Sequence, residues 1–427
     1  MAPPDLHRFT LDNGLRVVFA PDRTIPVVGV SVHYDVGFRS EPEGRTGFAH
    51  LFEHLMFQGS ESLEKLAHFR HVQSSGGTFN GSTTPDYTDY YEVLPSAGLE
   101  RALFLEADRM RAPRITQENL SNQIDVVKEE IRLNVLNRPY GGFPWIPLPA
   151  VLYQTFPNAH NGYGDFTELE SANLDDCASF FDTYYSPANA ILTVTGDFEV
   201  TAAKDLVAKH FGDVPSRPAP TRPSFAEPPP SGELRHEIED RLAPVPALAV
   251  GYRLPNPQTE LDAYLANVVL SAVLSEGDAS RLQQRMVQND ALVTDVGTNC
   301  GLFSPFEARD PDTFTVTAFY PGEIAPDAVL STLDQELDKL AGTGPEPTEL
   351  ARVTARWTAE LYADHDRIVS RTLALGGAEL LHGRAELIGE LPARIAAVTA
   401  EDVATAAKAL RPDSRAVLLI KPAGGAE

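Results

Sequence analysis

The chain has 427 residues, 43% of them hydrophobic, which is enough for two or three domains with sizeable cores. Its formal net charge of −25 argues against nucleic acid or an anionic membrane surface as a partner, because both would repel an acidic protein. Two cysteines, Cys177 and Cys300, are too few for a disulfide framework or a thiolate metal site, so histidines and carboxylates must hold any metal.

The beginning of the chain reads as part of a soluble protein. No apolar run reaches the length of about 18 residues that a membrane helix needs. The first residues, "MAPPDLHRFTLDNGLRVVFA", lack the basic region and apolar block of a secretory signal. We therefore expect a cytoplasmic protein with no membrane partner.

The first half opens with two strand-like segments, "GLRVVFA" and "VVGVSVHYDVG", which we expect to pair with each other. A helix is predicted over residues 46–57, "TGFAHLFEHLMF", and a further strand over 86–95, "DYTDYYEVLP". Residues 116–137 predict a long helix. Residues 174–198 predict a helix, a turn containing proline and a β-branched strand.

Three polar residues interrupt the apolar run of the 46–57 helix. A helix turns by about 100° per residue, so His50, Glu53 and His54 share one face. Two imidazoles one turn apart can bind one zinc ion, and a neighbouring carboxylate can take a proton from water. The alternative is an ordinary amphipathic helix with these residues at its polar boundary, so the motif needs a third ligand.

Several carboxylates of the 116–137 helix are candidates for that ligand: Glu118, Asp125, Glu129 and Glu130. An apolar stripe runs along this helix, and Gln123 and Glu130, seven residues apart, lie beside it on a common face. A carboxylate on the buried side needs a partner, and a metal would be one. Glu130 is therefore preferred, with Glu129 as the next candidate.

A proline-rich segment, residues 214–233, divides the chain and has the composition of an extended linker. The second half repeats the element order of the first, which indicates an internal repeat. Its expected elements are paired strands over 232–240 and 246–255, a strand over 312–321, helices over 259–275 and 347–364, and a helix, turn and strand over 399–422. We therefore predict an α+β protein of two homologous domains, 1–213 and 234–427, each a sheet with helices, the second without metal ligands.

With these features in place, the chain resembles the pitrilysin and mitochondrial-processing-peptidase family, half-size members of the inverzincin zinc peptidases. The resemblance rests on H-x-x-E-H, on a glutamate 76 residues after His54, and on the text "NQIDVV". It implies one zinc ion per chain held by His50, His54 and Glu130, with Glu53 as the general base. Gln123 stands where members often have glutamate, and would orient Glu130 through a hydrogen bond.

The resemblance also bears on the substrate. Asn80, in "GGTFNGS", would contact the peptide, although glycines and asparagine in this pattern are equally typical of a tight hairpin turn. Family enzymes carry an Arg/Tyr pair in the second domain to hold substrate. Anchored on "SRL" at residues 280–282, that pair falls on Val287 and Thr294, so both groups are missing.

The resemblance implies a zinc endopeptidase that hydrolyses unfolded peptides, or leader and targeting segments, inside a dimeric chamber. Each chain would form one bowl of a clamshell. A related subunit with the Arg/Tyr pair is the expected partner, giving a heterodimer, although a homodimer is possible. The alternatives are a non-catalytic scaffold or peptide-binding subunit of the same fold, and an unrelated α+β protein in which the spacing is a coincidence.

Overall fold

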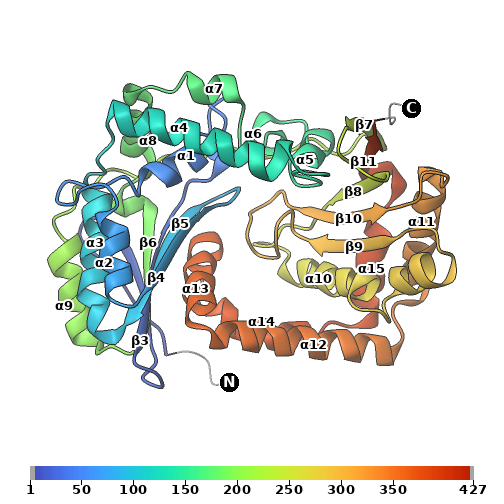
Figure 1. Cartoon of the computed structure of the whole chain (residues 1–427). Helices are drawn as coiled ribbons and strands as arrows, with labels where there is room; N and C mark the ends of the chain where they lie inside the picture. Colours follow the sequence, from blue (N-terminus) through green and yellow to red (C-terminus); the bar gives the residue numbers. More distant parts are fainter. Residues whose placement is uncertain (1–4, 424–427) are drawn as a thin grey trace. The chain divides into compact units, whose positions relative to one another are not determined.

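The computed structural model describes residues 5–423, which fall into two compact units (Figure 1). The first unit takes the residues up to Lys128 together with Gly162–Pro223 and Leu361–Glu390. The second takes Glu129–Asn161, Ser224–Glu360 and the residues from Leu391 onward. Each unit contains one β-sheet, in agreement with the predicted α+β class. Within residues 5–423, no helix combines the length and the apolarity that a membrane span requires.

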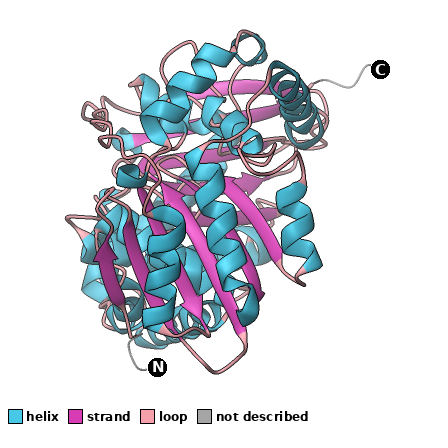
Figure 2. Ribbon diagram, turned by 90° about the vertical axis from the view of Figure 1, so that its left-hand side faces the viewer, coloured by secondary structure: helices cyan, strands magenta, loops and turns pink. Residues whose placement is uncertain are grey.

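The sheet of the first unit has six strands in the order β1-β2-β6-β3-β5-β4 (Figure 2). Its strands are β1 (His7–Thr10), β2 (Arg16–Pro21), β3 (Val27–Tyr34), β4 (Thr78–Thr83), β5 (Thr88–Pro95) and β6 (Ala190–Gly196). Strands β2 and β6 are parallel, and the other neighbours are antiparallel. Strand β4 therefore lies at one edge of the sheet.

The sheet of the second unit has five strands in the order β7-β11-β8-β10-β9. Its strands are β7 (Leu234–Asp240), β8 (Ala247–Arg253), β9 (Asp295–Cys300), β10 (Thr313–Phe319) and β11 (Arg415–Pro422). Strands β7 and β11 are parallel, and the remaining pairs are antiparallel. Apart from β1, this is the connectivity of the first sheet, strand for strand, as an internal repeat requires.

The predicted pairing of the two opening strands is wrong in both halves. Strand β6 lies between β2 and β3, and β11 lies between β7 and β8. The closing strand of each half is buried over most of its length: every residue of β6 is buried, and so are the first four residues of β11. Such a strand is stabilised more in the middle of a sheet than at its edge, and this pairing over a long sequence separation overrides the local one.

Helices cover both faces of the first sheet. The first unit contains α1 (Phe48–Leu55), α2 (Ala67–Ser74), α3 (Leu99–Arg111), α7 (Phe166–Glu170), α8 (Leu174–Tyr184), α9 (Val200–Phe211), α13 (Ile368–His382) and most of α4 (Gln117–Ile131). Strand β3 contacts α3 and α13, and all of its residues after Val27 are buried. Helix α1 packs against the edge strand β4.

The remaining helices belong wholly or partly to the second unit. They are α5 (Pro147–Leu152), α6 (Phe156–Ala159), α10 (Leu261–Ser275), α11 (Pro326–Thr343), α12 (Pro347–Asp366), α14 (Leu387–Ala396) and α15 (Ala400–Ala409). Short 3-10 or π segments are Phe38–Ser40, Ser96–Gly98, Arg132–Leu136, Pro187–Asn189, Gln283–Asn289 and Pro412–Ser414.

Each sheet is covered on one face by a helix from the other half of the sequence. In the first unit, Leu375 of α13 packs with Val18 and Ile191 of the sheet. In the second unit, Leu148 of α5 packs with Ala249 of β8 and its neighbours. By their contacts, residues 129–161 thus belong to the second unit and residues 361–390 to the first. The boundaries at 213 and 234 stay a prediction of where the linker begins and ends.

Candidate metal centre

Helix α1, which carries the His50, Glu53 and His54 motif, has a tightly held N-terminus. Its N-cap residue, Gly47, has a φ of 79°, in the left-handed region. The carboxylate of Glu41 accepts hydrogen bonds from the backbone N–H groups of Gly47, at 2.9 Å, and Ala49, at 2.7 Å. A side-chain acceptor at this end satisfies N–H groups that have no partner within the helix.

The apolar side of α1 anchors it on aromatic residues of α8 and of its C-terminal end. The buried members of this side are Phe48, Ala49, Leu51, Phe52 and Leu55. The Phe52 ring lies 5.2 Å from the ring of Phe180 and 4.7 Å from that of Tyr185, measured between centroids. Packing of this kind fixes the rotation of the helix, so the polar residues of the motif are presented on its other side.

The predicted ligands lie together. His50, His54 and Glu130 each offer a ligand atom, and these atoms lie within 4.8 Å of one another, in partly exposed positions. The two imidazole centroids are 4.9 Å apart, and the ring of Tyr163 stands 5.2 Å from that of His50. Glu130 is on the last turn of the continuous helix α4, two residues beyond the stretch grouped with the first unit.

The neighbouring carboxylate of Glu129 does not join this group. It is exposed, and it pairs with the guanidinium of Arg132 at 3.2 Å. The donor set of two imidazoles and one carboxylate is the type that catalytic zinc sites use, with a further position left for water or substrate. By its chemistry, the group of His50, His54 and Glu130 fits one zinc ion.

The motif glutamate, Glu53, faces the edge strand. The hydroxyl of Thr83 in β4 donates a hydrogen bond to its Oε2 atom at 2.7 Å. A Cβ atom placed on Gly81 of the same strand would lie 3.3 Å from Cγ of Glu53, which shows how closely strand and helix approach. The hydroxyl of Thr83 therefore holds the carboxylate beside the unpaired edge of the sheet.

The other two predicted site residues lie further from the motif. Gln123 is buried, two turns before Glu130 on the same helix. Asn80 is exposed on β4, where it pairs with Tyr91 of β5. Strand alternation places Asn80 on the face opposite to Thr83, so it does not point toward Glu53. Their roles toward Glu130 and the peptide stay predictions.

The positions that would carry an Arg/Tyr pair offer no such groups here. Val287 is half-buried in the π segment of residues 283–289, and Thr294 is exposed. The Thr294 hydroxyl donates to the backbone carbonyl of Phe319 at 3.1 Å. Neither side chain carries a charge.

Sequence reasoning missed two residues that shape the centre, Thr83 and Tyr163. Both come from segments distant in sequence, and only the folded chain brings them to α1. A threonine on the helix-facing side of a strand that follows a Gly-Gly turn would have been a usable signal. Tyr163 lies in an irregular segment and carries no such signal.

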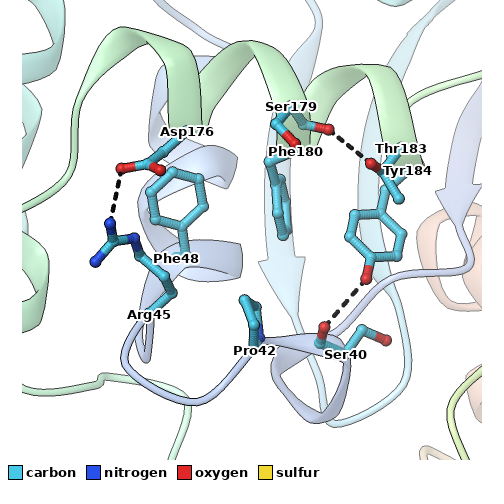
Figure 3. A pocket seen from close by; sticks show the side chains of 9 residues that line it. All are labelled: Ser40, Pro42, Arg45, Phe48, Asp176, Ser179, Phe180, Thr183 and Tyr184. Atoms are coloured by element: carbon cyan, nitrogen blue, oxygen red, sulfur yellow. Dashed lines mark hydrogen bonds and ion pairs between the residues drawn. The ribbon is translucent and has the colours of Figure 1, made fainter.

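A pocket opens beside the N-terminal end of α1 (Figure 3). The residues that line it are Ser40, Pro42, Arg45, Phe48, Asp176, Ser179, Phe180, Thr183 and Tyr184. Arg45 pairs with Asp176 at 3.3 Å, and the hydroxyl of Tyr184 donates to the carbonyl of Ser40 at 3.1 Å, so these groups already have partners within the protein. None of the predicted ligands lines it.

Comparison with known proteins places these features in a family. Residues 16–138 match the family model described as insulinase (peptidase family M16), and residues 171–356 match the model described as peptidase M16 inactive domain. The chain is 31% identical over 299 residues to zinc protease PqqE of Helicobacter pylori, covering 68% of this chain and 66% of that protein.

Two further likenesses extend over nearly the whole chain. The probable mitochondrial-processing peptidase subunit beta of Arabidopsis thaliana is 24% identical over 414 residues, which cover 94% of this chain and 76% of that protein. The crystal structure of a protease from Helicobacter pylori superimposes with a TM-score of 0.90 at 25% identity, covering 98% of this chain and all of the other. Models of one family match both halves, and the likeness in structure is full-length: the chain belongs to the M16 peptidase family.

Proposed function

We propose that the protein is a zinc-dependent endopeptidase that hydrolyses unfolded peptides, such as leader or targeting segments. One observation carries the proposal: the ligand atoms of His50, His54 and Glu130 converge within 4.8 Å, with Glu53 on the same helix. The name zinc protease, borne by a relative 31% identical to this chain, supports the same reaction.

In this proposal His50, His54 and Glu130 hold one zinc ion per chain. Zinc, when bound, supplies Lewis acidity that polarises a peptide carbonyl and makes water more acidic. Glu53 takes the proton of the attacking water and passes it to the leaving amine, as general base and then general acid. The hydrogen bond from Thr83 keeps the Glu53 carboxylate oriented for both transfers.

The edge strand β4 is the proposed docking place for the peptide. Its outer backbone N–H and C=O groups have no partner strand among the described residues, because β4 pairs only with β5. An extended peptide that adds to such an edge gains main-chain hydrogen bonds largely irrespective of its side chains. Asn80, exposed on this strand, is proposed to contact the bound peptide.

Zinc content and peptide cleavage of purified variants test the proposal. His50→Ala, His54→Ala and Glu130→Gln should lose zinc, and Glu129→Gln, the matched control one residue away, should keep it. Glu53→Gln should keep zinc but lose cleavage by about 10²- to 10⁴-fold, because only the proton transfer is removed. Equal cleavage by the wild type and Glu53→Gln would overturn the assignment.

A non-catalytic, peptide-binding subunit is the second candidate. It is favoured by the match of residues 171–356 to a model described as an inactive domain, and by Val287 and Thr294 at the positions of the Arg/Tyr pair. A zinc content below about a tenth of an equivalent, unchanged on adding metal, would favour this candidate.

We further propose that the chain works with a related subunit that carries the missing Arg/Tyr pair. A relative of this chain bears the name of a subunit beta, which supports assembly from unlike chains. Loss of one such oxyanion donor typically lowers the rate by about 10²- to 10³-fold. Mass and peptide turnover of the chain alone and with the partner decide the matter: full turnover by the isolated chain would refute the heterodimer.

A cytoplasmic location stays a prediction from the sequence.

A further inference from the structure

A buried polar cluster lies in the first unit, apart from the proposed zinc ligands. It is formed by His68 of α2, Glu92 of β5, and Glu106 and Arg109 of α3, all of them 5% exposed or less. The ligand-type atoms of His68, Glu92 and Glu106 lie within 4.8 Å of one another. Burying charges together is costly unless each is paired, so the balance of charge in this cluster decides its state.

One carboxylate of the cluster is fully paired. The guanidinium of Arg109 binds Glu106 through two hydrogen bonds, one from Nε to Oε2 at 2.9 Å and the other from Nη2 to Oε1. A bidentate pair of this kind neutralises one negative charge with one positive charge. The charge of Arg109 is thereby balanced by Glu106, although its Nη1 atom has no hydrogen-bond partner in the described part of the chain. The second carboxylate, Glu92, needs another source of compensation.

His68 does not supply it. Its Nε2 atom lies 2.7 Å from Oε1 of Glu92. However, the two atoms do not form a hydrogen bond, and burial and the nearby Arg109 lower the pKa of His68 to about 3, which favours a neutral imidazole. With both glutamates ionised, the cluster would contain two negative charges and one positive charge. One negative charge would be left without a counter-charge in the interior.

The surroundings of Glu92 identify what is missing. Neither of its carboxylate oxygens accepts a hydrogen bond from an N–H or O–H group in the part of the chain that the structure describes. Its close polar neighbours are His68 and the carboxylate of Glu106. Two carboxyl groups can hydrogen-bond to each other only when one of them carries a proton.

We propose that Glu92 and Glu106 share one proton, and that the cluster is a buried proton-binding site whose net charge is zero when this proton is present. Burial raises the pKa of both carboxyl groups to about 7, against the opposing effect of Arg109. A divalent metal would be a poorer occupant, because it would give the cluster an excess positive charge beside Arg109.

Other titratable groups face the cluster without replacing that proton. They are His71 of α2, Tyr34 of β3, Tyr90 of β5 and Tyr185 after α8. The negative charge of Glu53 on α1 also raises the pKa of Tyr90 and Tyr185. Burial raises the pKa of Tyr34, Tyr90 and Tyr185 above the ordinary value, so the three stay neutral where the carboxyl pair titrates.

The cluster adjoins the end of α1. The guanidinium carbon of Arg109 lies 4.3 Å from the ring centroid of Tyr90 and 5.1 Å from that of Phe57, two residues after α1. Cation–π contacts of this kind depend on the arginine staying in place. By balancing the charge around Arg109, the shared proton helps to keep these contacts near the end of α1 in place. The proposal of a shared proton does not depend on peptidase activity.

The sign of the pH effect follows from the raised pKa values. Between the ordinary value of 4.5 and about 7, the folded protein holds a proton that the unfolded chain has released. The stability contributed by the shared proton is therefore present in full below about 4.5 and is lost as the pH rises through this window. The unfolding equilibrium constant contributed by the pair should rise about tenfold per pH unit there.

The variants Glu92→Gln and Glu106→Gln test the proposal together with the double variant. Each single variant leaves one carboxylate for Arg109, so the cluster is neutral without a proton and the contribution of the pair should vanish. The lowered pKa of His68 acts in the opposite direction below 6.5 in all of these proteins, so the contribution of the pair is measured as the difference in slope between the wild type and each single variant. The double variant leaves Arg109 buried with no carboxylate, so its urea midpoint should fall below those of both single variants. Glu118→Gln, an exposed glutamate on α4, is the control and should keep the wild-type dependence.

Infrared spectroscopy gives a direct readout of the same proton. At about pH 6, below the raised pKa values, the wild type should show the carbonyl band of a buried protonated carboxyl group, absent in both single variants. Persistence of that band in both, or an unchanged pH dependence, would overturn the proposal. So would a second equivalent of zinc in the wild type that is lost in Glu92→Gln. None of these readouts requires peptide cleavage, so failure of the proposed function is recognised separately.

Discussion

The substitution Gly47→Ala tests how closely the backbone before α1 is packed. Gly47 has a φ of 79°, and a Cβ atom there would lie 2.4 Å from the carbonyl oxygen of Tyr163 and 3.0 Å from its carbon. Both atoms belong to the backbone, so no side chain can turn away. Either the loop at Tyr163 or the start of α1 must move.

The expected loss of stability has two parts. An L-residue in the left-handed region costs about 1 kcal/mol, and a forced backbone shift adds about 2 kcal/mol. For a unit of this size, each kcal/mol lowers the melting temperature by about 2–4 °C. The variant should therefore melt roughly 6–12 °C lower, and it should bind zinc more weakly because α1 carries His50 and His54.

Thermal melting of metal-free protein, followed by zinc titration, measures both effects. Gly44→Ala is the matched control: Gly44 has a φ of 84° but nothing within 4 Å of the added Cβ atom. It incurs only the conformational cost, a fall of about 2–4 °C. If Gly47→Ala melts no lower than Gly44→Ala, the contact with Tyr163 is not a constraint and the reasoning fails.

Further predictions concern the two thiols, the proposed zinc ion, one buried histidine and two glycines. Burial raises the pKa of Cys177 to about 12 and that of Cys300 above its ordinary value. Alkylating reagents should therefore label neither thiol in the native protein, which mass spectrometry can show. Chelators, in contrast, should abolish cleavage reversibly. Burial lowers the pKa of His33 from 6.5 to about 3, so the unfolded chain binds more protons at this site, and the stability contributed by His33 should be lost as the pH drops below 6.5. Relative to the wild type, the urea midpoint of His33→Gln should fall less steeply over this range. Gly376→Ala should destabilise, since its Cβ atom would lie 2.4 Å from the His33 ring, whereas Gly377→Ala, with nothing within 4 Å, should stabilise by about 1 kcal/mol in melting experiments.

The local structure of the chain was largely readable from its sequence. Periodicity located α1, β3, β6 and the repeat of elements in the second half, because each depends on neighbouring residues. The apolar stripe of α4, together with the family resemblance and its glutamate 76 residues after His54, pointed to the carboxylate that the fold brings to the histidines. Glu129, one residue away, points to a different partner.

What could not be read depends on distant contacts. The insertion of β6 between β2 and β3 is set by packing over more than 150 residues of sequence, which no local pattern encodes. Helix α3 was not predicted, because its buried side contains Glu106 and Arg109, and charged residues read as a solvent-facing surface. Their burial is possible because the two side chains form a bidentate pair with each other.

The exchange of helices between the sheets changes what a break in the chain would do. A cut within the proline-rich segment 214–233 gives two fragments, and each keeps a helix that the other fragment's sheet needs. A nicked protein should therefore stay assembled until it is denatured. Produced separately, the fragment 1–213 would lack α13 and leave Val18 and Ile191 uncovered, so it should aggregate unless the residues of α13 are added back as a peptide. Although the sequence contains two copies of the repeat, each copy therefore needs a helix from the other to complete its core.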